Sequence, residues 1–153
     1  NLVVPPSGRT LSGGLDPAAL HMPKRFFGAA RNMREGGSLT IIAAMDIETG
    51  VKADDTIVEE FKGTANMELV LDQAVAKAGV HPAFNLSRCS TKRAELLLTP
   101  EQLEGVHLTR KILGSTHSAT AIPQLLEMMD KVDSNATFLA RIKDWAALME
   151  KSR

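Results

Sequence analysis

The chain has 153 residues, equal numbers of basic and acidic residues (18 each), and only 4% aromatic residues, with no tyrosine. The length suffices for one domain with a hydrophobic core but not for two. The balanced charge gives no sign of nucleic-acid recognition through overall charge, and the few aromatics argue against a base-stacking platform. Any nucleic-acid contact must therefore come from cations on particular loops.

Cysteine content and hydropathy indicate where the protein works. The single cysteine, Cys89, cannot form an internal disulfide, and no apolar run reaches the roughly 20 residues of a membrane span. We therefore expect a cytoplasmic protein without membrane contact. The chain opens on Asn1, and an apolar triplet runs directly into two prolines, which we interpret as a segment of a longer protein.

The N-terminal segment predicts a loop followed by a helix. Residues 5–14 contain two prolines, three glycines and two serines, and their only charge is Arg9. Asp16 is expected to cap a helix with Pro17 at its first position. Met22-Pro23 is expected to interrupt that helix, and residues 24–33 are expected to pack onto a sheet.

The apolar run of residues 39–45 predicts a strand buried on both faces. A polar loop follows it, with Gly50 and Lys52 at the tip. Loops at such a sheet edge are where α/β proteins bind their ligands. Asp54 or Asp55 is expected to cap the next helix.

The middle of the chain predicts two further strands. Residues 66–72 alternate between apolar and polar, which is typical of a half-buried strand with Met67, Leu69 and Leu71 inward. A short helix over residues 73–78 is expected to end at Gly79. Residues 80–86 are expected to form an edge strand, and residues 87–93 a basic loop.

The last third of the chain predicts helices only. Thr99-Pro100, with Gln102 three residues after the threonine, matches a capping box. We expect helices over residues ~100–114, ~118–132 and ~135–151, the second interrupted early by Pro123. The side chains expected to be buried on the last two helices are Leu125, Leu126, Met128, Met129, Phe138, Leu139, Ile142, Trp145 and Leu148.

Enzymatic motifs are scarce. The four histidines are far apart and lack metal-ligand spacing, so no metal site is predicted. Cys89 is interpreted as a loop cysteine without a catalytic role. No GxxxxGK[ST] phosphate loop occurs in the sequence, so this chain is not expected to cradle a nucleotide by itself.

Three loops carry a cation beside glycine, serine or threonine, and we name them in chain order. The first loop is residues 7–11, the second loop is residues 49–52, and the third loop is residues 90–93. Freed backbone amides, small hydroxyls and a cation suit phosphate oxygens. Loops also have this composition simply because they are solvated, and the pattern alone leaves both interpretations open.

Longer strings of sequence carry a resemblance. SGRTLSGGLDPAAL, PKRFFGAARNMREGGSLTIIA and EEFKGTANMEL closely resemble the C-terminal half of the bacterial transcription termination factor Rho family, with similarity from residue 1 to about 98 and a looser helical remainder. That family consists of hexameric, RecA-like, ATP-driven translocases on RNA. The resemblance implies an α/β fold: the second half of a RecA-like parallel sheet (P-loop NTPase class) in residues 1–98, and C-terminal helices of the same domain in 99–153. It also implies that the Walker A and Walker B segments lie outside this chain.

The resemblance implies roles for individual residues. The first loop falls on the family's RNA-contacting Q loop, the second on its RNA-contacting R loop, and the third on the stretch that supplies an arginine finger to the neighbour's ATP. Strict alignment puts Lys92 on the finger, whereas the guanidinium that suits a transferring phosphate belongs to Arg93. Gly79 stands where the family often has another arginine. The implied residues are Ser7, Gly8, Arg9, Thr10, Leu11, Thr49, Gly50 and Lys52 for RNA, Lys62 and Gly63 for the nucleotide interface, and Lys92 and Arg93 for catalysis.

The implied function is that of part of an ATP-dependent RNA helicase that terminates transcription. The implied partners are single-stranded RNA, RNA polymerase indirectly, and further copies in a homo-hexamer. ATP and Mg²⁺ are implied for the intact protein only, and this chain alone is predicted to be inactive. Two alternatives remain: a non-catalytic oligomerisation or interaction module, including a stand-alone relative, and a small-molecule α/β enzyme, which the lack of a catalytic constellation disfavours.

Overall fold

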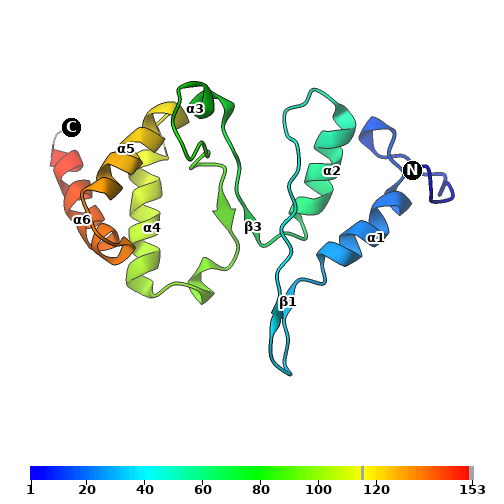
Figure 1. Cartoon of the computed structure of the whole chain (residues 1–153), viewed down its shortest axis with the longest axis horizontal. Helices are drawn as coiled ribbons and strands as arrows, with labels where there is room; N and C mark the ends of the chain where they lie inside the picture. The colour runs from blue at the N-terminus through cyan, green and yellow to red at the C-terminus, as the bar shows by residue number, and fades with distance from the viewer. Residues whose placement is uncertain (115, 152–153) are drawn as a thin grey trace. The chain divides into compact units, whose positions relative to one another are not determined.

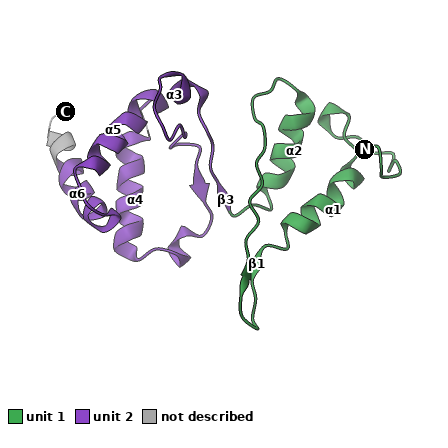
Figure 2. Ribbon diagram, in the orientation of Figure 1, with its two compact units in different colours: residues 1–66 green, residues 67–153 purple. Residues whose placement is uncertain are grey.

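The structure is a computed structural model that describes residues 1–114 and 116–151, with side chains described up to residue 147. Contacts divide the chain into unit 1 (residues 1–66) and unit 2 (residues 67–153), as Figure 2 shows. The predicted boundary between the α/β part (residues 1–98) and the helical part (residues 99–153) falls inside unit 2, and it stays a prediction. The elements in chain order are η1 (Ser12–Gly14), α1 (Pro17–Phe27), β1 (Arg31–Asn32), β2 (Ser38–Leu39), α2 (Lys52–Lys62), β3 (Met67–Glu68), α3 (Gln73–Lys77), β4 (Ser90–Thr91), η2 (Ala94–Leu96), α4 (Pro100–Leu113), α5 (Ser118–Asp130) and α6 (Asn135–Lys151) (Figure 1).

Helix α1 of unit 1 begins as predicted. The Asp16 carboxylate accepts a hydrogen bond from the Ala18 N–H at 2.8 Å, and Pro17 occupies the first helical position. The predicted interruption is wrong, because α1 continues through Pro23 to Phe27. Proline lacks an N–H, so the helix loses one backbone hydrogen bond there, but the fixed φ of proline is compatible with a helix.

Two contacts join α1 to α2. The rings of Phe27 and Phe61 lie 5.7 Å apart between centroids, and Lys24 Nζ lies 2.8 Å from Glu60 Oε2. Phe26 is 70% exposed, so the predicted packing of this segment onto a sheet is wrong for that residue. Leu20, at 8% exposure, is the one buried apolar residue among the described residues of unit 1.

The apolar run of residues 39–45 does not form the predicted strand. β2 covers only Ser38–Leu39 and pairs antiparallel with β1, and Ile42 is 92% exposed. The predicted parallel sheet is likewise not found among the described residues, whose two sheets are antiparallel pairs. A strand buried on both faces needs neighbouring strands on each edge, and here the run meets only the two-residue β1. The described residues therefore form a mixed α/β structure with small antiparallel sheets.

Unit 2 also departs from its predicted strands. β3 pairs antiparallel with β4, and beyond it a single bridge joins Leu71 to Phe84. The predicted alternation is inverted, since Met67, Leu69 and Leu71 are each more than 60% exposed. The backbone explains the inversion: the Asn85 N–H donates to the Val70 carbonyl at 2.8 Å, and the Val70 N–H donates to Cys89 Sγ at 3.3 Å. Val70 is accordingly half-buried between its exposed neighbours, and the predicted strand over residues 80–86 is reduced to the bridge.

The short helix of unit 2 forms as predicted. Asp72 caps α3 by accepting hydrogen bonds from the Ala74 and Val75 N–H groups, and Gly79 follows at φ +74°. Partial burial raises the pKa of Asp72, but hydrogen bonds from Val75, Ala74, Ser118 and Asn85 outweigh burial and hold it below its ordinary value. The cap therefore carries a carboxylate that ties together three parts of unit 2: α3, the segment at Asn85 and the start of α5.

The predicted C-terminal helices α4, α5 and α6 are confirmed, although α5 continues across Pro123, so the predicted interruption is wrong. Gly105 lets α6 approach α4, since a Cβ on it would lie 2.9 Å from Leu139 Cδ2.

Met129 is 40% exposed, contrary to prediction, and Leu148 lies outside the described side chains. No helix in the described part of the chain is both long and apolar enough to cross a bilayer. The buried core of these helices consists of Leu113, Ala121, Leu125, Phe138 and Ile142.

Candidate functional site

Asp16 closes the base of the first loop. The Ser7 N–H donates to Asp16 Oδ2 at 2.6 Å, and the Ser7 hydroxyl donates to Asp16 Oδ1 at 2.7 Å. The Ser7 N–H, the Ser7 hydroxyl and the Ala18 N–H together hold the pKa of Asp16 below its ordinary value. A single ionised carboxylate therefore caps α1 and anchors the loop that precedes it.

Arg9 stands exposed on this anchored loop. Its N–H donates to Ser7 Oγ at 3.3 Å, and no described residue accepts a hydrogen bond from its guanidinium. Gly8 before it has φ +77°, a left-handed conformation that favours glycine. The Arg9 guanidinium is therefore available to an anion. An open hollow of about 450 Å³ beside it is lined by Ser7, Arg9, Pro17, Ala18 and His21.

The second loop leads directly into α2. Thr49 Oγ1 accepts from the Val51 N–H at 3.1 Å and donates to Asp54 Oδ2 at 2.8 Å. The prediction that Asp54 or Asp55 caps the helix is wrong: Val51 is the N-cap and makes no side-chain cap. The physical reason is that the helix starts earlier than expected, which leaves both aspartates inside its first turn. Lys52 is consequently the first residue of α2 rather than part of a loop tip, and its exposed ammonium pairs with no described residue.

The first and second loops meet through the elements that follow them. The Thr56 hydroxyl of α2 donates to the Ser12 carbonyl of η1 at 2.9 Å. Gly13 lies directly on the start of α2, since a Cβ built on it would be 2.5 Å from the Ala53 nitrogen. Figure 1 shows the blue N-terminal loop beside the beginning of α2. The structure therefore places η1, which directly follows the first loop, against the end of the second loop at Lys52 and the first turn of α2.

Lys62 and Gly63 lie at the opposite end of α2 from Lys52. The Lys62 ammonium forms an ion pair with the Glu59 carboxylate, and Gly63 is the C-cap. Ten residues of helix at about 1.5 Å each separate the two lysines by roughly 15 Å. One helix therefore carries a candidate RNA contact at its beginning and a candidate nucleotide-interface residue at its end.

Lys92 and Arg93 belong to unit 2, after β4. Arg93 has φ +55° and is the N-cap of η2. Its Nε–H donates to the Glu95 carboxylate, and this hydrogen bond is the main reason why the pKa of Glu95 lies below its ordinary value. The other candidate residues all belong to unit 1.

Sequence reasoning missed three residues that shape the site. The sequence predicts Asp16 only as a helix cap, and it predicts no role for Gly13 or Thr56. The signal for Asp16 was weak, because its second partner, Ser7, is nine residues away. Cys89 has a structural role through its contact with the Val70 backbone. In the part of the chain that the structure describes, no group of three His, Cys, Asp or Glu side chains could hold a metal ion.

The described residues form a mixed α/β protein with small antiparallel sheets, and they carry exposed cations on or directly after three loops. No family model matches the chain. Transcription termination factor Rho of Thermotoga maritima is 54% identical over 142 residues, which is 93% of this chain and 33% of that protein. The Rho proteins of Bacillus subtilis and Pseudomonas aeruginosa are 51% and 48% identical over 90% and 94% of this chain.

The resemblance to Rho is therefore confirmed along nearly the whole chain. This chain is a relative of transcription termination factor Rho, and the match is consistent with the C-terminal part of such a protein. The chain spans about a third of the length of the curated relatives it matches.

Proposed function

We propose that this chain provides the RNA-contacting loops of an ATP-dependent RNA translocase that terminates transcription. The observation that carries the proposal is the contact of η1 with the start of α2, because η1 follows the loop of Arg9 and lies against the backbone of Lys52 and Ala53. Both cations are exposed and pair with no described residue, so both can bind phosphates of single-stranded RNA without breaking an ion pair. The similarity to Rho supports RNA as the polyanion and a RecA-like fold for the intact protein.

The proposal assigns ATP and Mg²⁺ to the intact protein. The residues of this chain do not form a phosphate cradle, because the sequence has no GxxxxGK[ST] loop. We propose instead that they lie next to a nucleotide site at a subunit interface. Lys62 and Gly63 would lie near the nucleotide, and the cationic side chain of Arg93 or Lys92 would contact the ATP of the neighbouring subunit. This role requires a homo-oligomer, which we propose to be a hexamer by likeness to Rho. The intact protein would act on RNA polymerase only indirectly.

RNA binding by the full-length protein tests the proposal. Arg9→Ala and Lys52→Ala should each weaken binding for every RNA sequence alike, since phosphate contacts carry no sequence information. Each lost contact should flatten the dependence of log K on log salt by roughly 0.7. Lys52→Ala should change the free energy of unfolding by less than about 0.5 kcal/mol, because the side chain is exposed.

Lys77→Ala is the matched control, because Lys77 is an exposed helical cation outside the three loops. It should leave both affinity and salt dependence unchanged. If Arg9→Ala and Lys52→Ala both bind RNA as the wild type does, these residues are ordinary solvated cations and the proposal is wrong.

A second candidate function is a non-catalytic interaction module. It is favoured by the third loop, where the Arg93 guanidinium is engaged by Glu95, and by Gly79 in place of a second arginine. RNA-stimulated ATP hydrolysis by the full-length protein separates the two candidates. Binding of RNA without any stimulated hydrolysis would favour the interaction module.

A further inference from the structure

The contact of η1 with α2 depends on glycine at position 13. A Cβ built on Gly13 would lie 2.5 Å from the Ala53 nitrogen, 2.6 Å from its Cα and 2.9 Å from the Lys52 carbonyl carbon. All three atoms are backbone, so no side-chain movement can relieve the clash. Any larger residue would have to lift η1 away from the first turn of α2.

Thr56 forms the second half of the same contact. Its hydroxyl donates to the Ser12 carbonyl at 2.9 Å, 44 residues away in sequence, and shares that proton with the Lys52 carbonyl of its own helix, also at 2.9 Å. A threonine in a helix can satisfy its hydroxyl within the helix alone. The additional bond to Ser12 therefore ties η1 to the helix that carries Lys52.

We propose that Gly13 and Thr56 are positioning residues that hold Arg9 and Lys52 in one arrangement, so that the two cations bind the same RNA strand jointly. The inference rests on the proposed function and extends it to residues that touch no RNA. Arg9 lies four residues before Gly13, and Lys52 lies four residues before Thr56. Asp16 anchors the base of the first loop and Thr49 bonds the second loop to Asp54, but neither bond links the two segments to each other, which the contact through Gly13 and Thr56 does. Fixing both loops before RNA arrives removes an ordering cost from binding.

Gly13→Ala, compared with Gly14→Ala, tests the contact with matched backbone strain. Both glycines have left-handed φ values, +80° and +77°, so alanine is strained equally at either position. Nothing lies within 4 Å of a Cβ on Gly14. Gly13→Ala should therefore weaken the binding of a short labelled oligouridine by the full-length protein, and Gly14→Ala should bind it markedly better than Gly13→Ala.

A double-mutant cycle between Arg9→Ala and Lys52→Ala measures joint binding directly. In the wild-type background, Lys52→Ala should lower the affinity for RNA by a certain factor. When Arg9 is already alanine, the factor lost through Lys52→Ala should be at least about 5-fold smaller. In the Thr56→Val and Gly13→Ala backgrounds, the affinity lost in the double variant should equal the product of the losses from Arg9→Ala and Lys52→Ala. The coupling factor between the two residues should therefore be near one. Thr40→Val is the control background, since Thr40 is exposed and makes no side-chain hydrogen bond among the described residues. It should keep the wild-type coupling.

The outcomes separate this inference from the proposed function. If both single substitutions weaken binding but the coupling is absent in the wild type, or survives unchanged in Thr56→Val and Gly13→Ala, the inference is overturned and the proposed function stands. If neither substitution weakens binding, both are overturned. Circular dichroism reports whether each variant folds, and Thr56→Val decides alone if Gly13→Ala does not.

Discussion

Arg93 and Lys92 compete for one role at the third loop. The Arg93 guanidinium is held by the Glu95 carboxylate on an exposed surface, a pair weak enough to open for a phosphate. Because only a guanidinium offers two parallel donors, we expect Arg93 to be the catalytic cation. In the full-length protein, Arg93→Ala should lower RNA-stimulated ATP turnover on the order of 10³-fold.

The control for this prediction lies in the same basic segment. Arg88→Ala removes a cation outside the third loop and should leave turnover near the wild-type value. Greater damage from Lys92→Ala than from Arg93→Ala would show that strict alignment identifies the catalytic residue and that preference for the guanidinium is mistaken.

Asp16 makes the first loop sensitive to acid. Its pKa in the folded chain lies below the ordinary value of 3.8, chiefly because the Ser7 N–H and hydroxyl donate to it. A depressed pKa means that the stabilisation is fully present above pH 3.8 and is lost as the pH falls through the folded value. Protection of the Ser7 amide from hydrogen exchange should therefore be constant at neutral pH and disappear with a midpoint below 3.8.

Two variants define the origin of that transition. Asp16→Asn should lack the Ser7 protection at every pH, whereas Asp55→Asn, which changes an exposed carboxylate of α2, should leave it intact. A midpoint at or above 3.8 would contradict the proposed anchoring by the ionised carboxylate.

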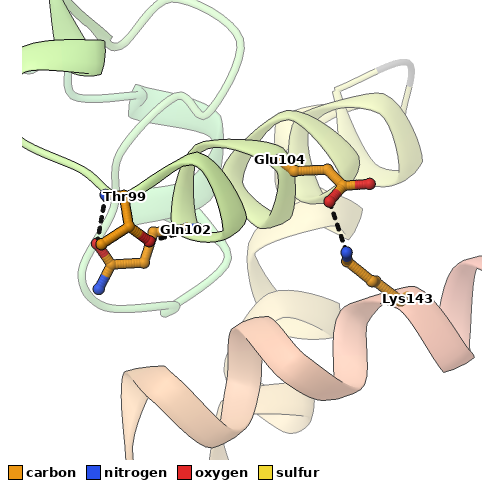
Figure 3. A network of polar contacts seen from close by, with 4 residues as sticks. All are labelled: Thr99, Gln102, Glu104 and Lys143. Atoms are coloured by element: carbon orange, nitrogen blue, oxygen red, sulfur yellow. Dashed lines mark hydrogen bonds and ion pairs between the residues drawn. The ribbon is translucent and has the colours of Figure 1, made fainter.

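We expect the capping box at the start of α4 to stabilise this helix more than the exposed ion pair between Glu104 and Lys143 does. Gln102 Oε1 accepts from the Thr99 N–H at 2.9 Å, while Thr99 Oγ1 accepts from the Gln102 N–H (Figure 3). Thr99→Ala should lower the free energy of unfolding by about 1 kcal/mol. Glu104→Gln, which removes the exposed ion pair with Lys143, should change it by less than about 0.5 kcal/mol. Urea unfolding measures both, and an equal loss would contradict this ranking.

Elements with a local chemical signature could be predicted from the sequence. Asp16-Pro17 and the Thr99 capping box set helix starts within a few residues, and the cations on the loops could be found by composition. The strands could not, because the run at residues 39–45 depends on neighbours that local sequence does not specify. The Thr56–Ser12 bond was also inaccessible, since a hydroxyl and a backbone carbonyl 44 residues apart leave no pattern.

For the whole molecule, we predict that the isolated chain lacks the ATPase activity proposed for the full-length protein. The isolated chain should hydrolyse no ATP and bind it only weakly, because no phosphate-cradling loop is encoded. Calorimetry on the pure chain measures this. Saturable micromolar binding would contradict it, and the full-length protein under the same conditions is the positive control.

The apolar run after β2 has a consequence for handling the isolated chain. Ile42 is 92% exposed, and no described strand pairs with residues 40–45. Unpaired backbone beside exposed β-branched side chains is a template on which a second molecule can add a strand. Concentrated solutions of the isolated chain should therefore aggregate through this segment, and a charge at Ile42 should delay the aggregation without disturbing the helices of unit 2.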